Sequence, residues 1–244
     1  MIAIEQARLE PRSLRLPLLI RLEPAGSRVE ISNDTLGYST KCSFTYGILM
    51  TLSRQDYRTL IRTQRNQLTQ EEQKRSAESL ATHFLTLPEI KQAQDIALYL
   101  PADGEIDTSI IIDQLRHLNK NIYLPVIHPF SSGHLLFLRY DLTTAMVHNR
   151  YHIPEPKLEK DKIIPVAQLD IICTPLVAFD KHGHRLGMGG GYYDRTLEPW
   201  FHYQSGPKPI GLAHACQEVE QLPVEAWDVP LPKIITAKQI WDWE

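Results

Sequence analysis

The sequence is poor in cysteine, has no long apolar run and carries no marked excess of either charge. Its three cysteines, Cys42, Cys173 and Cys216, are widely spaced and form no C-x-x-C pair, which argues against a disulfide framework and against a structural zinc site. No stretch approaches the roughly 20 apolar residues of a membrane-spanning helix. We therefore expect a protein of the reducing cytoplasm that has no membrane partner.

The overall charge gives no support to a nucleic-acid partner either. The 244 residues are 43% hydrophobic and 23% charged, and the formal net charge is −3. Such values are typical of a globular protein, and the chain is long enough for one ample domain or two small ones. A net negative charge does not favour binding to nucleic acid. We therefore expect a globular protein with no nucleic-acid partner.

Residues 1–49 differ from the rest of the chain. Gly, Ser, Asn, Asp and Thr dominate from residue 25 to residue 45, and no sustained period of 2 or 3.6 is present. The segment also lacks the apolar region and the small-residue cleavage site of a signal peptide. We predict a poorly ordered extension before a folded domain at residues 50–244. Because strong patterning begins at Met50, a start codon assigned too early would also explain the extension.

From residue 53 onward, helical and strand patterns alternate. Ser53 and Thr69 are expected to cap two helices, the second with Glu72 at the capping-box position. The order of elements predicts an α/β fold, a single three-layer domain with a mostly parallel sheet and helices on both faces. Helices are predicted over residues 53–67, 70–87, 108–118 and from about 192, and strands over 96–100, 121–127, 134–140, 170–177, 208–213 and 233–236.

The first predicted helix carries a row of arginines. With spacings of 4, 4 and 3 they share one helix face, and like charges so placed repel by a few tenths of a kcal/mol each. A nearby anion would explain the row, whereas a solvated basic face is the alternative. RNA binding is a third interpretation, but the row lacks interleaved aromatic residues and a wider basic stripe. The four residues are Arg54, Arg58, Arg62 and Arg65.

The most informative stretch runs from Arg185 to Arg195 and has the sequence RLGMGGGYYDR. It follows an apolar strand and precedes a predicted helix, so that backbone N–H groups at its glycines would point at an anion. The flanking arginines add positive charge, and Asp194 offers a carboxylate to a metal ion. The stretch matches neither the Walker A loop nor the dinucleotide fingerprint. A flexible hinge or a tight turn would explain the glycines alone, but the combination favours a triphosphate cradle with a magnesium ligand.

Polar residues also follow other predicted strands, and ligands of open α/β sheets bind beyond the carboxyl ends of strands. Glu105 is the preferred candidate for a donor-rich ligand, because one carboxylate can accept two hydrogen bonds side by side. The alternative, an acid favoured by a helix N-terminus, suits Asp107 better. Asp228 is a second magnesium candidate, although an Asp before a proline-rich turn is often only a turn former. Cys216 near His214 makes a weak case for a thiol nucleophile, since no third group is identifiable.

Together these motifs resemble the 5-formyltetrahydrofolate cyclo-ligase family, also called 5,10-methenyltetrahydrofolate synthetases. The most specific match is the segment 175–180 with Gly183 and the stretch from Arg185 to Arg195, within a resemblance that covers about residues 54–243. Supporting motifs are the basic first helix, the turn from Leu100 to Thr108, the Glu155–Pro156 pair and the segment around Asp228.

The resemblance implies an ATP-dependent ring closure by a monomer with a three-layer α/β fold. ATP would phosphorylate the formyl oxygen of 5-formyltetrahydrofolate, N10 would attack the activated carbon, and phosphate would leave to give 5,10-methenyltetrahydrofolate and ADP. Phosphoryl transfer depends mainly on positioning and charge stabilisation, which suits the arginines and glycines. A binding protein for nucleotide or folate, without turnover, is the alternative on the same fold. The chain departs from the family at Arg54, where Lys is usual, and at Tyr57, where Leu is usual.

The resemblance also implies roles for individual residues. Arg185 and Tyr192 are implied in catalysis, and Asp194 and Asp228 in binding Mg²⁺. The implied ATP contacts are Arg54, Arg58, Arg185, Leu186, Gly187, Met188, Gly189, Gly190, Gly191, Tyr192 and Tyr193. The implied folate contacts are Leu100, Glu105, Met188, Gly189, Gly190, Gly191 and Tyr192.

Overall fold

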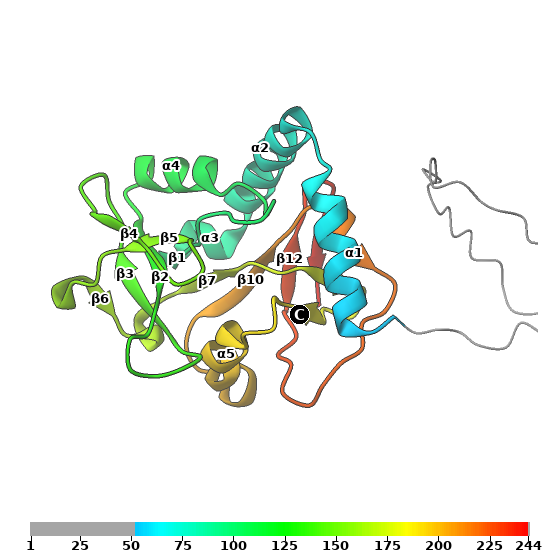
Figure 1. Ribbon diagram of the computed structural model, residues 1–244. Coiled ribbons are helices and arrows are strands. Elements are labelled where there is room, and N and C mark those ends of the chain that lie inside the picture. Colours follow the sequence, from blue (N-terminus) through cyan, green and yellow to red (C-terminus); the bar gives the residue numbers. More distant parts are fainter. Residues whose placement is uncertain (1–51, 244) are drawn as a thin grey trace, which may run out of the picture. The chain divides into compact units, whose positions relative to one another are not determined.

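The protein is described here by a computed structural model that covers residues 52–243, and the extension predicted at residues 1–49 lies outside these. An eight-stranded sheet forms the middle layer (Figure 1). In spatial order its strands are β13 (Ile240–Asp242), β12 (Lys233–Ile235), β10 (Lys208–Leu212), β7 (Ile171–Thr174), β1 (Asp95–Ala97), β2 (Asn121–Ile127), β3 (Leu135–Arg139) and β6 (Ile163–Ile164).

The central strands of this sheet run parallel, from β12 through β10, β7 and β1 to β2. Every residue of β7 is buried, as expected for a strand that is covered on both faces. Antiparallel strands close both edges, with β13 beside β12 and with β3 and β6 beyond β2. The α/β fold with a mostly parallel sheet, predicted from the sequence, is confirmed.

Helices cover both faces of the sheet (Figure 1). On one face α2, α3 and α4 bury apolar side chains such as Phe84 and Leu115. On the other face Leu197 of α5 packs with Phe179 in a second buried cluster. Burying one such side chain stabilises a fold by roughly 1.5–3 kcal/mol. The helices are α2 (Gln70–Thr86), α3 (Pro88–Gln92), α4 (Ser109–His117) and α5 (Tyr192–Tyr203).

A second, three-stranded sheet packs against α1 (Arg54–Asn66). Ile61 of α1 shares a buried cluster with Ala178 and Leu186 of this sheet. Because the second sheet leads directly into the glycine-rich stretch, it fixes α1 beside that stretch. Its strands are β11 (Glu218–Val219), β8 (Ala178–Asp180) and β9 (Arg185–Leu186).

Several boundaries differ from the sequence prediction, and the strand predicted over 96–100 already ends at Ala97. The strand predicted over 170–177 ends at Thr174, because the chain leaves the large sheet and enters β8 of the small one. Pro88 not only ends the helix before it but also starts α3, since proline is favoured in the first turn of a helix. The segment 141–168, predicted as loop, contains short elements without a strong sequence pattern. They are β4 (Met146–His148), β5 (Pro154–Pro156), β6 and the 3-10 turns at Lys160–Lys162 and Val166–Gln168. A third 3-10 turn, Ala215–Gln217, lies outside this segment.

Candidate active site

The arginine row of α1 contacts two different parts of the molecule. The helix begins with a reciprocal capping box, in which the Ser53 hydroxyl accepts from the Asp56 N–H and the Asp56 carboxylate accepts from the Ser53 N–H. The first two arginines contact Asp228 and the glycine-rich stretch, and the last two contact the loop that carries Glu105. The row therefore connects the segments that the sequence predicts to bind ligands.

Arg54 binds Asp228, one of the two carboxylates predicted to hold magnesium. The guanidinium forms two hydrogen bonds with this carboxylate, one of them from Nη2 to Oδ1 at 2.9 Å, and Nη1 also donates to the Pro223 carbonyl at 3.1 Å. Burial alone would raise the pKa of Asp228, but the Arg54 hydrogen bond, the Glu225 N–H and the charges of Arg54 and Arg185 together outweigh it, so that the pKa lies below its ordinary value. Asp228 is therefore ionised at neutral pH, as a metal ligand must be.

The glycine-rich stretch forms a turn between β9 and α5. Gly191, which precedes α5, has a φ of 65°, in the left-handed region that favours glycine. Arg58 Nε donates to the Gly187 carbonyl at 2.9 Å, and Arg195 Nη1 donates to the Gly190 carbonyl at 2.9 Å. Neither arginine is paired with a carboxylate within residues 52–243. The turn is thus held by two cations whose charge no described acid neutralises directly.

Arg185 and Asp194 form a largely buried ion pair next to this turn. Arg185 Nη2 donates to Asp194 Oδ1 at 2.6 Å, and the Val229 N–H donates to the same oxygen at 3.4 Å. Only 2% of the Arg185 side chain is exposed, and its Nε has no hydrogen-bond partner in the described part of the chain. Burial lowers the pKa of Arg185, although the charge of Asp194 opposes the shift. A buried donor without a partner is costly, so this atom points to a ligand.

The two carboxylates predicted to hold magnesium lie near the same pair of arginines. The charges of both Asp194 and Asp228 act on Arg54 and on Arg185. Across residues 52–243, no cluster of three or more His, Cys, Asp or Glu could form a metal site by itself. Two carboxylates still suit Mg²⁺, which usually takes one or two from the protein and completes its shell with phosphate oxygens and water. The residues present therefore fit Mg²⁺ bound together with phosphates.

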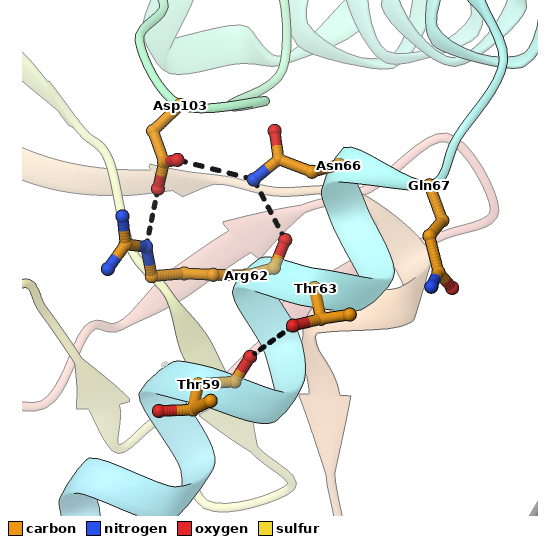
Figure 2. Close-up of a pocket in the computed structure, with 6 residues that line it drawn as sticks. All are labelled: Thr59, Arg62, Thr63, Asn66, Gln67 and Asp103. Atoms are coloured by element: carbon orange, nitrogen blue, oxygen red, sulfur yellow. Dashed lines mark hydrogen bonds and ion pairs between the residues drawn. The ribbon is translucent and has the colours of Figure 1, made fainter. Parts of the chain in front are cut away.

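The loop that carries Glu105 is fixed by the last turn of α1. Asp103 accepts from Arg62 Nε at 2.6 Å and from Asn66 Nδ2 at 3.2 Å, as Figure 2 shows, and from Arg65 Nη2 at 2.8 Å. Gly104 has a φ of 73°, and a Cβ there would lie 2.5 Å from the Asn66 side-chain oxygen, so glycine is required. An open groove of about 440 Å³ lies along this contact. It is lined by Thr59, Arg62, Thr63, Asn66, Gln67 and Asp103.

Glu105 itself is partly buried. Its Oε2 accepts from the Ala102 N–H at 3.1 Å, and its carboxylate forms no ion pair with the residues described. Burial raises the pKa of Glu105 to about 7, although the Arg65 charge opposes the shift. Burial and then the Glu105 charge raise the pKa of the Tyr99 and Tyr193 hydroxyls. A shielded carboxyl with unused acceptor positions suits a donor-rich heterocycle.

Tyr192 begins α5 and is contacted by the tip of the β4–β5 hairpin. Its hydroxyl accepts from Arg150 Nη2 and lies 3.2 Å from the Tyr151 hydroxyl. The sequence analysis identified neither of these hairpin residues, nor Asp103. Each of the three is linked to its partner across a long stretch of chain that no local pattern encodes. The one available signal for the hairpin was the Glu155–Pro156 pair, which lies in its second strand.

The remaining candidates have less support from the geometry. Asp107 Oδ1 accepts from the Ser109 N–H at 2.8 Å, as expected of an acid at a helix start. Burial raises the pKa of Cys216, the opposite of what activates a thiol. Neither imidazole nitrogen of His214 makes a hydrogen bond of normal geometry, although the ring lies close to backbone of the Glu105 loop. Leu100 packs at the margin of the main core. Cys216 and His214 therefore do not form an activated thiol.

Comparison with known proteins agrees with these features. The model of the 5-formyltetrahydrofolate cyclo-ligase family matches residues 50–237. The 5-formyltetrahydrofolate cyclo-ligase of Escherichia coli K12 is 50% identical over 184 residues, which are 75% of this chain and 100% of that protein. The enzyme of the same name from Haemophilus influenzae is 52% identical over 185 residues, covering 76% of this chain and 98% of that protein.

Two solved structures are also similar. The NMR structure of Aquifex aeolicus 5,10-methenyltetrahydrofolate synthetase aligns with a TM-score of 0.67 at 29% identity, covering 78% of this chain and 93% of that one. The 5,10-methenyltetrahydrofolate synthetase from Mycoplasma pneumoniae aligns with a TM-score of 0.60 at 25% identity, covering 76% and 99%. Separately, no helix within residues 52–243 has the length and apolar character required to cross a membrane.

Proposed function

Since this chain belongs to the 5-formyltetrahydrofolate cyclo-ligase family, we propose that it converts 5-formyltetrahydrofolate to 5,10-methenyltetrahydrofolate with Mg-ATP as co-substrate. The formyl oxygen attacks the γ-phosphorus of ATP, and the bond to ADP breaks. N10 then attacks the formyl carbon and forms the new C–N bond, while phosphate and the N10 proton leave. Phosphorylation is needed because the formyl oxygen is otherwise a poor leaving group.

The observation that carries this proposal is the buried Arg185 Nε that has no partner in the described chain. Asp194 holds the other end of this guanidinium, so the free donor is oriented before any ligand arrives. A preorganised cation of this kind stabilises the charge that develops on a transferring phosphoryl group. We assign this catalytic role to Arg185.

The phosphates of ATP would be held by the glycine turn and by the first two arginines of α1. Arg54 and Arg58 each contact the protein through only some of their N–H groups and can donate others to phosphate. Mg²⁺ held by Asp194 and Asp228 would neutralise charge on the phosphate oxygens. The remaining ATP contacts are the glycine turn itself, from Leu186 to Tyr193.

The folate would lie between the Glu105 loop and the start of α5. Glu105 can accept hydrogen bonds from the N–H groups of the pterin, and Leu100, at the margin of the main core, would supply apolar surface. Tyr192 is implied in catalysis as well as in binding, and its hydroxyl is held in place by the hairpin tip. Met188 is 53% exposed and free to border the substrate. A monomeric state and a cytoplasmic location remain predictions from the sequence.

The direct test is an ATP-dependent assay with the purified full chain. With 5-formyltetrahydrofolate and Mg-ATP we expect the absorbance of the methenyl product to develop, and without ATP we expect none. Asp194→Asn should lower kcat at least a hundredfold or so, because it removes the negative charge that both the metal ion and Arg185 face. Asp113→Asn is the matched control, since this exposed residue of α4 pairs only with Arg116.

The assay also separates the two functions that the fold allows. Folded protein that binds both ATP and 5-formyltetrahydrofolate but gives no absorbance would be a binding protein without turnover. Turnover in Asp194→Asn at the wild-type rate would remove the metal assignment while leaving the reaction itself intact.

A further inference from the structure

The tip of the β4–β5 hairpin places a cation beside Tyr192. Arg150 Nη2 donates to the Tyr192 hydroxyl, and its guanidinium carbon lies 5.0 Å from the centre of the Tyr151 ring. The two tyrosine hydroxyls are 3.2 Å apart. A guanidinium has five N–H donors in a fixed fork, so these contacts leave several donors for a ligand.

The backbone of this tip is held firmly. Asn149 Oδ1 accepts from the N–H groups of Tyr151 at 2.9 Å and of Ile153 at 3.2 Å. Asn149 Nδ2 in turn donates to Glu155 Oε2 at 3.1 Å, and the same oxygen accepts from the Ile127 N–H of β2 at 3.1 Å. The tip is therefore tied to the large sheet. Such preorganisation reduces the cost of binding a ligand.

Arg150 is electrostatically separate from the arginines assigned to ATP. Arg54 and Arg185 both interact with Asp194 and Asp228. Arg150 instead donates to the Tyr192 hydroxyl and lies over the Tyr151 ring, and no carboxylate is paired with it among residues 52–243. Arg150 is therefore a second region of positive charge at the edge of the site, apart from the arginines assigned to ATP.

Resting on the proposed function for the identity of the ligand, we propose that Arg150 binds a carboxylate of the glutamyl group of the folate substrate. The two substrates bring two separate sets of negative charge, the phosphates of ATP and the glutamyl carboxylates of folate. The phosphates have Arg54, Arg58 and Arg185. The fork of donors on Arg150 matches a carboxylate, which guanidinium groups bind with two parallel hydrogen bonds.

The burial of the two ends of the site agrees with this orientation. Glu105, assigned to the pterin end, is partly buried, whereas Arg150 is exposed. In a folate molecule the pterin and the glutamyl group lie at opposite ends. A folate whose pterin is bound inside by Glu105, and which passes Tyr192, would present its glutamyl group at the exposed hairpin tip.

The test compares two substrates that differ only in the glutamyl group. With 5-formyltetrahydrofolate, Arg150→Gln should raise KM for the folate about tenfold, the size of one charge-assisted hydrogen bond. With 5-formyltetrahydropteroate, which lacks the glutamyl group, wild type and Arg150→Gln should have the same KM. KM for ATP should not change in either case. Arg150→Lys should recover part of the affinity, because the charge remains.

Matched controls keep the comparison decisive. Arg75→Gln, at an exposed position of α2 paired with Glu71, should change neither KM. Calorimetric binding of the two folates without ATP gives the same comparison and remains informative if the chain lacks turnover. The proposed activity and the glutamyl contact can therefore fail independently.

Three results would overturn the assignment. An equal loss with both folates would mean that Arg150 acts only through Tyr192. A rise in KM for ATP would assign the anion to the phosphates. Unchanged kinetics and binding in Arg150→Gln would leave the hairpin tip without any role in substrate recognition.

Discussion

Asp103 and Glu105 lie two residues apart in one loop, yet their carboxyl groups have opposite properties. Burial would raise the pKa of Asp103, but hydrogen bonds from Arg62, Arg65 and Asn66 outweigh it and hold the pKa below its ordinary value. Burial raises the pKa of Glu105 to about 7, because no arginine is hydrogen-bonded to it. One loop thus holds a fixed negative charge and, two residues later, a carboxyl group that titrates near neutral pH.

The contrast shows that the carboxylates of the site fall into two classes, according to whether an arginine is paired with them. Asp103, Asp194 and Asp228 are each held by an arginine. Such a pair fixes geometry and keeps the carboxylate ionised. Glu105 accepts one backbone N–H and keeps its other acceptor positions. The first class orders the site, whereas Glu105 has acceptor positions left for a ligand.

Glu105→Gln tests this contrast most strongly, because it removes the titratable group and keeps the shape of the side chain. We expect kcat/KM for the folate to fall about a hundredfold, since two hydrogen bonds to a charged acceptor are weakened. In the wild type, kcat/KM should rise with pH through about 7 as Glu105 ionises. In Glu105→Gln this step should be absent. A step that persists would assign the ionisation to another group.

The ionisation of Glu105 should affect stability in the opposite direction: as the pH rises, kcat/KM of the wild type increases while its free energy of unfolding decreases. The folded pKa of Glu105 lies above the unfolded value of about 4.3, so its contribution to stability is complete below that value and is lost as the pH rises to about 7. Relative to Glu105→Gln, the wild type should lose at most about 4 kcal/mol between these limits. Urea unfolding at pH 4 and pH 8 measures the difference, and Glu71→Gln, on the exposed face of α2, is the control.

Most of the fold followed from local pattern in the sequence. Apolar runs located the central strands, capping residues such as Ser53 and Thr69 located helix starts, and the alternation of elements gave the α/β class. The short strands of the hairpin and of the small sheet were missed. They have two or three residues, too few for a period, and they form because neighbouring segments present partners.

The sequence could suggest candidate site residues only where one short segment contains the functional groups. The glycine turn, Glu105, Asp194 and Asp228 were proposed as candidates from residue types within short windows. Asp103 and Arg150 were not, because their importance depends on partners in distant parts of the chain. The raised pKa of Glu105 was equally invisible, since burial comes from the packing of several elements and not from the loop that carries it.

Asp103→Asn tests the other carboxyl group of this loop, and we expect its effect to be smaller than that of Glu105→Gln. Arg65 is fully buried and would lose its charged partner, whereas Asp103 is 33% exposed and would be partly compensated by water. We expect a loss of about 2 kcal/mol in the free energy of unfolding. Because the folded pKa of Asp103 is lowered, the loss should be complete above the unfolded pKa and disappear as the pH falls through the folded pKa.

Urea unfolding of Asp103→Asn beside Asp113→Asn separates this contact from a general effect of removing an acid, since Asp113 pairs only with Arg116 at the surface. Folate binding should weaken in parallel, because the loop also positions Glu105. Equal stability of Asp103→Asn and wild type at pH 7 would mean that the arginines of α1 do not fix this loop.

Arg54→Lys tests the arginine that holds Asp228. The Arg54 guanidinium binds Asp228 with two hydrogen bonds and also reaches the Pro223 carbonyl, whereas a lysine can direct only a point charge at one of them. The pair is 23% exposed on the arginine side, which limits its strength to that of a surface ion pair. We therefore expect KM for ATP to rise only about threefold, with kcat unchanged. If Arg54 instead rigidly positions Asp228 for magnesium, the Mg²⁺ concentration for half-maximal rate would rise at least tenfold in Arg54→Lys and not in Arg62→Lys, which contacts Asp103 alone.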